Sequence, residues 1–140
     1  MKNKIIKTGV AIVVTKENKI LLGLLSKKWL YNNKQVYGVP GRDVRFGEKI
    51  GDTVKRNILE DLGCSVTKYN IFAVNSNYVY GNHYIEIGVL ADIEGDLKNL
   101  MPVDWEKWEW FDFSHIPKNL FPSAKNVIDS YLKKVVNVEE

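Results

Sequence analysis

The sequence predicts a sandwich of the α/β or α+β class, in which helices cover a mixed β-sheet. Three observations support this fold class: β-rich runs precede a central amphipathic helix, further β-rich runs follow it, and a second amphipathic helix comes last. We expect a single domain over residues 1–140, because this length is sufficient to bury a hydrophobic core without disulfides or structural metals.

Charge and hydropathy argue against a nucleic-acid-binding, secreted or membrane protein. A net charge of +3 is too small to indicate binding to a nucleic acid polymer. The apolar run near the N-terminus is short and lacks a small-residue cleavage site, so it predicts a first strand rather than a signal peptide. No run approaches the roughly 18 apolar residues of a membrane span. We therefore expect a cytoplasmic protein, in which the lone Cys64 is a small buried residue.

The elements before the central helix are β-rich. Residues 8–15 and 17–25 form two runs around a turn from Lys16 to Lys19, which is typical of a hairpin. A polar loop follows at 26–35, and residues 36–40 read as a short strand that ends at Pro40.

The central helix is predicted from Ile50 to Leu62. Apolar residues recur every four positions, at Ile50, Val54, Ile58 and Leu62, which gives one apolar stripe. Gly63 is a natural helix stop.

The segment after this helix is again β-rich and ends in a second helix. It contains predicted strands at 69–80, 83–93 and 105–113, a turn at 81–83, a loop at 114–121 and a helix at 123–136. Alternation along the last strand places Trp108 and Trp110 on the same face.

Three oxygen-bearing side chains share one face of the central helix. Asn57, Glu60 and Asp61 are spaced by three and four residues, which places them within roughly 100° of one another. Such hard oxygen ligands suit Mg²⁺ or Mn²⁺ better than zinc. The alternative is a solvated acidic face in which Arg56 pairs with Glu60 four residues later.

The loop before the helix adds a longer pattern. Gly41 and Gly47 allow a backbone carbonyl or amide to approach a ligand closely. Loop and helix together resemble the signature of the Nudix hydrolase family: Gly, five residues, Glu, seven residues, Arg, Glu, an aliphatic residue, any residue, Glu, Glu, any residue, Gly and an aliphatic residue. The matching positions are Glu48, Arg56, Ile58, Glu60 and Gly63, with Asp61 in place of the last Glu.

The resemblance covers nearly the whole chain and is greatest to the nucleoside-triphosphate (MutT-like) branch. Shared landmarks in the same order include GVAIVVT, ILLG, FGE, VNS and WEW. The resemblance implies a Nudix α/β/α sandwich with a mixed sheet between helices. It also implies Mg²⁺- or Mn²⁺-dependent hydrolysis of a phosphoanhydride in a small-molecule nucleotide, most simply a nucleoside triphosphate to a monophosphate and pyrophosphate. A homodimer is possible for this branch.

Site residues follow from the same resemblance. Glu60 and Asp61 are expected to bind the metal and to activate water, with Asn57, the Gly41 carbonyl and Glu106 as further metal ligands. Glu48 and Arg56 are expected to pair and to orient the loop on the helix. For the substrate, we expect contacts from Arg42, Arg45 and His83, and from Trp108 or Trp110 stacking on the base.

Three positions depart from the family pattern. Arg42 replaces the first Gly of the signature, Asn57 replaces the acid after Arg56, and Arg45 stands where the triphosphate branch often has an acid. Each change makes the site more positive. The arginines could bind substrate phosphates directly. Two alternatives therefore remain: a nucleotide-sugar hydrolase, and a nucleotide-binding or regulatory module with weakened catalysis.

Overall fold

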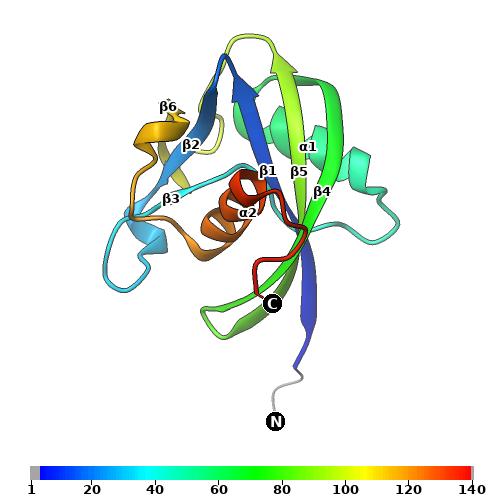
Figure 1. Cartoon of the computed structure of the whole chain (residues 1–140), viewed down its shortest axis with the longest axis vertical. Coiled ribbons are helices and arrows are strands. Elements are labelled where there is room, and N and C mark those ends of the chain that lie inside the picture. Colours follow the sequence, from blue (N-terminus) through cyan, green and yellow to red (C-terminus); the bar gives the residue numbers. More distant parts are fainter. Residues whose placement is uncertain (1–3, 140) are drawn as a thin grey trace.

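A computed structural model describes residues 4–139 as six strands and two α-helices, with two short 3₁₀ helices in the connections (Figure 1). The strands are β1 (Ile6–Lys16), β2 (Lys19–Leu25), β3 (Tyr37–Gly38), β4 (Ser65–Val79), β5 (Asn82–Glu94) and β6 (Trp105–Asp112). The helices are α1 (Ile50–Leu62), α2 (Pro122–Lys133) and the 3₁₀ turns η1 (Lys27–Trp29) and η2 (Phe113–His115).

The sheet is mixed, as the sequence predicts. Its strand order is β3-β2-β1-β5-β4, and β6 pairs with the other edge of β2. Strands β1 and β5 are parallel over nine residue pairs, whereas the other pairings are antiparallel. The predicted hairpin is present, but β1 and β2 pair only through Thr15–Ile20 and Lys16–Lys19 before they diverge.

The segment after β3 lies in the gap that opens between β1 and β2. Its backbone carbonyls accept hydrogen bonds from β1: Ile12 N–H donates to the Pro40 carbonyl at 2.9 Å and Val10 N–H to the Arg42 carbonyl at 3.1 Å. Val44 N–H donates in turn to the Thr8 carbonyl at 2.9 Å. These bonds fix the backbone of Arg42 at the centre of the sheet, where it can reach helix α1.

The two helices cover opposite faces of the sheet (Figure 1). Alternate residues of β1 divide between two cores, because successive strand side chains point to opposite faces. Val10 and Ile12 pack with Val54 and Ile58 of α1. Ala11 and Val13 pack with residues of α2. The predicted α/β/α sandwich is therefore confirmed.

Helix α1 has the predicted bounds. Val54, Ile58 and Leu62 are fully buried, and each contributes about 1.5–3 kcal/mol of hydrophobic free energy. Gly63 ends the helix in the left-handed conformation at φ 67°, and its N–H donates to the Leu59 carbonyl. The apolar stripe thus fixes the opposite, polar side of α1 toward the loop at 40–48.

Three smaller expectations have different outcomes. Cys64 is buried, as predicted. The turn between β4 and β5 is at Tyr80 and Gly81, both with positive φ, so His83 lies within β5 and not in the turn. Within residues 4–139, no helix has both the length and the apolar character needed to cross a bilayer.

Candidate functional site

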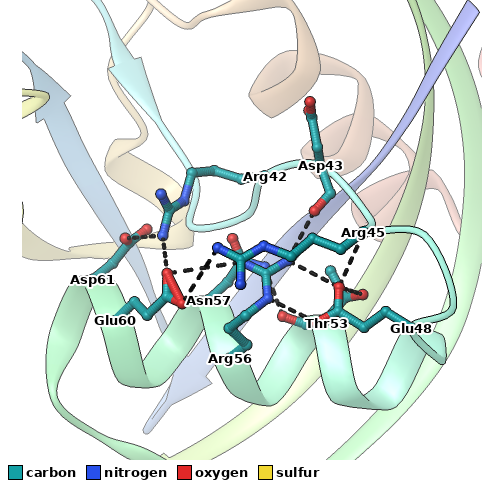
Figure 2. A network of polar contacts seen from close by, with 9 residues as sticks. All are labelled: Arg42, Asp43, Arg45, Glu48, Thr53, Arg56, Asn57, Glu60 and Asp61. Carbon is teal, nitrogen blue, oxygen red and sulfur yellow. Dashed lines mark hydrogen bonds and ion pairs between the residues drawn. The ribbon is translucent and has the colours of Figure 1, made fainter.

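The loop between β3 and α1 approaches the sheet closely at Gly41. Gly41 has φ 135°, and a Cβ atom there would lie 2.0 Å from the Val10 carbonyl oxygen. Only glycine therefore fits this position. The next residue, Arg42, projects its side chain toward the polar side of α1 (Figure 2).

Glu48 and Arg56 form the pair that the sequence predicts. Arg56 Nε donates to Glu48 Oε2 at 2.7 Å and Nη2 donates to Oε1 at 2.9 Å. Glu48 also accepts hydrogen bonds from the Thr53 hydroxyl at 2.7 Å and from Arg45 N–H at 3.0 Å. The hydrogen bonds from Arg56, and then those from Arg45 and Thr53, hold the pKa of Glu48 well below its ordinary value. Because Arg56 also donates to the Asp43 carbonyl, the pair ties the loop to the helix.

A second group of charges lies one turn further along α1 (Figure 2). Arg42 Nη2 is 2.9 Å from Glu60 Oε2 and 3.0 Å from Asp61 Oδ1, so one nitrogen of the guanidinium lies between the two carboxylates. Arg45 and Arg56 are each 3.8 Å from Glu60. The fold therefore surrounds the two predicted acids, Glu60 and Asp61, with three arginines.

The carboxylate of Asp61 is buried and lacks hydrogen bonds from residues 4–139 in this arrangement. Its side chain is 1% exposed, and neither carboxylate oxygen accepts an aligned hydrogen bond from the residues described. Burial raises the pKa of Asp61 to about 6, although the charge of Arg42 acts in the opposite direction. A buried carboxylate without hydrogen bonds is costly for the fold.

The donor set does not fit the divalent metal that the family resemblance implies. Asn57 is fully buried; its amide nitrogen donates to the Thr53 carbonyl at 2.6 Å, whereas its Oδ1 accepts no hydrogen bond from the residues described. Glu106 lies exposed on β6. Among residues 4–139, no group of three or more histidine, cysteine or carboxylate side chains is placed to hold a metal ion. The remaining pair, Glu60 and Asp61, already has the Arg42 guanidinium between its carboxylates.

A cavity of about 730 Å³ lies beside this charged group. Its cationic lining residues are Lys7, Arg42, Arg45 and Arg56, and Gly41 lines it as well. Its aromatic lining residues are Trp29, Tyr80, Tyr84, Trp105 and Phe121. The Tyr80 ring lies 6.1 Å from that of Trp29 and 5.9 Å from that of Phe121, so these rings form one apolar surface. The volume is that of an ordinary small-molecule site.

Three carboxylates that were not predicted as site residues also line the cavity: Asp43, Glu86 and Asp104. Burial, and next the neighbouring charge of Asp43, raises the pKa of Glu86 to about 7. Asp104 accepts a hydrogen bond from the Trp29 indole at 2.8 Å. The signal for Glu86 was a single acid within the apolar run YIEIGVL.

Three residues predicted to contact the substrate lie elsewhere. Asn82, Tyr84 and Glu86 of β5 line the cavity, so His83 points to the opposite side of the strand. Trp108 and Trp110 pack against the core beneath α1 and do not line the cavity. The aromatic residues that do line it come from η1, the β4–β5 turn, β5, the start of β6 and the residue before α2.

The fold and the site define a class: an α/β/α sandwich whose cavity combines cationic and aromatic side chains at the end of a signature loop and helix. The NUDIX domain family model matches residues 6–131. The ADP-ribose pyrophosphatase of Methanocaldococcus jannaschii is 32% identical over 126 residues, which are 86% of this chain and 70% of that protein. The chain therefore belongs to the Nudix family of hydrolases.

Solved structures agree with this fold. The MutT NUDIX hydrolase from Burkholderia pseudomallei has a TM-score of 0.78 at 22% identity, covering 87% of this chain and 95% of that one. The MutT protein from Methanosarcina mazei Go1 has a TM-score of 0.79 at 17% identity, covering 96% and 98% of the two chains. At these identities the likeness establishes the fold alone.

Proposed function

We propose that this protein hydrolyses the phosphoanhydride of a nucleoside diphosphate linked to a further group, with ADP-ribose as the first substrate to test. The observation that carries the proposal is the cavity of about 730 Å³, where arginines lie near the signature helix and aromatic rings form a separate surface. The rings offer a stacking surface for a nucleobase, and the arginines offer hydrogen bonds to phosphate oxygens. The relative from Methanocaldococcus jannaschii supports ADP-ribose as the choice of substrate.

Phosphate binding is assigned to the cations that are least engaged. The Arg45 side chain is 64% exposed and makes only a 3.8 Å contact with Glu60. Lys7 also lines the cavity. Arg56 is unsuitable, because Glu48 and the Asp43 carbonyl already take its donors. Arg45 and Lys7 would therefore stabilise the negative charge that develops on the phosphates during hydrolysis.

Glu86 is the best placed general base. Glu60 and Asp61 do not line the cavity and are paired with Arg42, whereas Glu86 lines the cavity and has a pKa near neutrality. Water attacks one phosphorus atom, its proton passes to the Glu86 carboxylate, and the bond from phosphorus to the bridging oxygen breaks. From ADP-ribose the products are AMP and ribose 5-phosphate.

A nucleoside triphosphate is the second candidate substrate. The resemblance of the signature loop and helix to the triphosphate branch favours this candidate, and Arg45 and Lys7 are the cations available for its phosphates. Hydrolysis would then give a nucleoside monophosphate and pyrophosphate, or a diphosphate and phosphate.

The test is turnover of ADP-ribose and of the common nucleoside triphosphates, with products separated by ion-exchange chromatography. Each substrate is assayed with Mg²⁺, with Mn²⁺ and with a chelator. Glu86→Gln should lose turnover but keep nucleotide binding. Glu94→Gln is the matched control, because Glu94 is an exposed acid further along the same strand.

Two results would count against the proposal. Tight binding of nucleotides without turnover of any of them would favour a binding or regulatory module. Full turnover by Glu86→Gln would remove Glu86 from the reaction.

A further inference from the structure

We infer that the Arg42 guanidinium is a built-in cation that occupies the position between Glu60 and Asp61, so that this pair does not bind a divalent metal. The inference concerns the same cavity as the proposed function. It is tested without any nucleotide, so either proposal can fail while the other stands.

The geometry is that of a cation shared by two carboxylates. A single nitrogen, Arg42 Nη2, lies 2.9 Å from Glu60 Oε2 and 3.0 Å from Asp61 Oδ1. A metal bridging the same two oxygens would have to occupy the space of that nitrogen, since Mg²⁺–oxygen distances are about 2.1 Å. Guanidinium and metal therefore exclude each other at this position.

The position of Arg42 is fixed by its backbone. The Arg42 carbonyl accepts the Val10 N–H from β1, and the preceding Gly41 packs against the Val10 carbonyl. A side chain that starts here is directed to the polar side of α1, as Figure 2 shows. The contact therefore follows from replacing the first glycine of the signature with arginine.

Arginines already supply positive charge to these acids. Arg42, Arg45 and Arg56 face Glu48, Glu60 and Asp61, and the charge of Asp104 also acts on Asp61. The position beside Arg56 carries the neutral Asn57, whose amide nitrogen donates to the Thr53 carbonyl. A divalent cation would add two positive charges beside three arginines, whereas removal of one arginine would make the group more negative.

Arg42 also retains donors for a ligand. Its side chain lines the cavity and is 37% exposed, while its Nε is buried without a partner among the residues described. Because Nη2 is held by the carboxylates and Nε is buried, Nη1 is the nitrogen left to donate to an oxyanion. Phosphate oxygens accept such charge-assisted hydrogen bonds.

The experiment measures Mn²⁺ binding by electron paramagnetic resonance in four proteins without nucleotide: wild type, Asp61→Asn, Arg42→Gly and Arg42→Gly/Asp61→Asn. Wild type and Asp61→Asn should bind Mn²⁺ equally weakly. Arg42→Gly restores the signature glycine and should bind at least about a hundredfold more tightly, because a charge some 3 Å from the ion is removed. The double variant should lose this gain.

Arg45→Gly is the matched control, because Arg45 also faces Glu60 but at 3.8 Å and 64% exposed, and it should gain little. Arg42→Gln keeps most of the side-chain volume and tests the same point if the glycine variant does not fold. Stronger Mn²⁺ binding by wild type than by Asp61→Asn would overturn the inference. So would a failure of folded Arg42→Gly and Arg42→Gln to gain Mn²⁺ binding.

Discussion

The two arginine–carboxylate contacts along helix α1 are similar in composition but differ in how fully their polar atoms are satisfied. Glu48 accepts two hydrogen bonds from Arg56, one from the Thr53 hydroxyl and one from Arg45 N–H. Asp61 accepts none from the residues described, although Arg42 Nη2 is 3.0 Å away. The pKa of Glu48 is lowered and that of Asp61 is raised to about 6.

The difference in hydrogen bonding indicates that Glu48 has a structural role and Asp61 a functional one. A carboxylate that accepts four hydrogen bonds stabilises the loop that carries it. A buried carboxylate without hydrogen bonds destabilises the fold, and proteins retain such groups mainly where a ligand or a reaction needs them. The Arg56 pair is thus a structural clamp, and the Arg42 group is the functional part of the signature.

Removing each arginine tests this comparison most strongly. Arg56→Ala leaves the half-buried Glu48 without its main partner and frees the loop, so the melting temperature should fall by about 10 °C. Arg42→Ala should lower it by less than half as much, because Arg42 makes one hydrogen bond, to a partly exposed Glu60, and the buried Asp61 left behind would take up a proton, since its pKa is already raised to about 6. Thermal unfolding followed by circular dichroism measures both. Equal shifts would show that the two contacts are equivalent.

A third carboxylate, Glu86, also has a raised pKa, which makes the stability of the protein depend on pH. Its pKa of about 7 in the folded protein lies above the ordinary 4.5. Below about pH 4.5 the Glu86 carboxyl is protonated in both the folded and the unfolded protein. Between about pH 4.5 and pH 7 it ionises in the unfolded protein but not in the folded one, so the free energy of unfolding falls as pH rises. Above about pH 7 the carboxyl is ionised in both states, and the loss in free energy of unfolding stays constant at up to about 3 kcal/mol. Asp43 contributes to the shift.

Glu86→Gln should remove this pH dependence. The gain in free energy of unfolding over wild type should grow from about pH 5 to about pH 7 and then level off. Urea unfolding at several pH values measures it. The exposed Glu94→Gln should show no such trend, and a flat difference for Glu86→Gln would contradict the raised pKa.

The aromatic part of the cavity provides a smaller effect. Trp29→Leu removes a ring that lies 6.1 Å from Tyr80, and we expect KM for the nucleotide to rise about tenfold with kcat little changed. Trp29→Phe keeps a ring but loses the indole hydrogen bond to Asp104, so it should stay near wild type. Steady-state kinetics would contradict base stacking here if both variants had equal KM values.

The sequence was sufficient for the helices, the strands and the class of the fold, because these depend on local patterns. The apolar stripe of Ile50, Val54, Ile58 and Leu62 predicted the bounds of α1, and the Glu48–Arg56 pair followed from the signature spacing. These features need only a helix and the loop before it. The closure of β1 on β5 brings distant residues together and leaves no local pattern.

The cavity depends on such distant contacts, so the substrate residues were harder to predict. Trp108 and Trp110 share a strand face, but alternation does not reveal which face lies against α1. Trp29 and Phe121 both lie against Tyr80, although the three residues come from distant parts of the chain. The departures at Arg42 and Asn57 were visible in the sequence, yet the position of the guanidinium between two carboxylates required the structure.

The smallest expected change in stability is also the most direct test of the comparison. Asp61→Asn removes charge from a buried group that accepts no hydrogen bond among the described residues, while Arg42 keeps its bond to Glu60. The free energy of unfolding should therefore stay the same or rise by up to about 1 kcal/mol, because desolvation of the charge is relieved. The isosteric Glu48→Gln should instead destabilise the protein, since it weakens four hydrogen bonds. Chemical unfolding of both variants decides between them: a loss of stability for Asp61→Asn as large as that for Glu48→Gln would make Asp61 a second structural clamp.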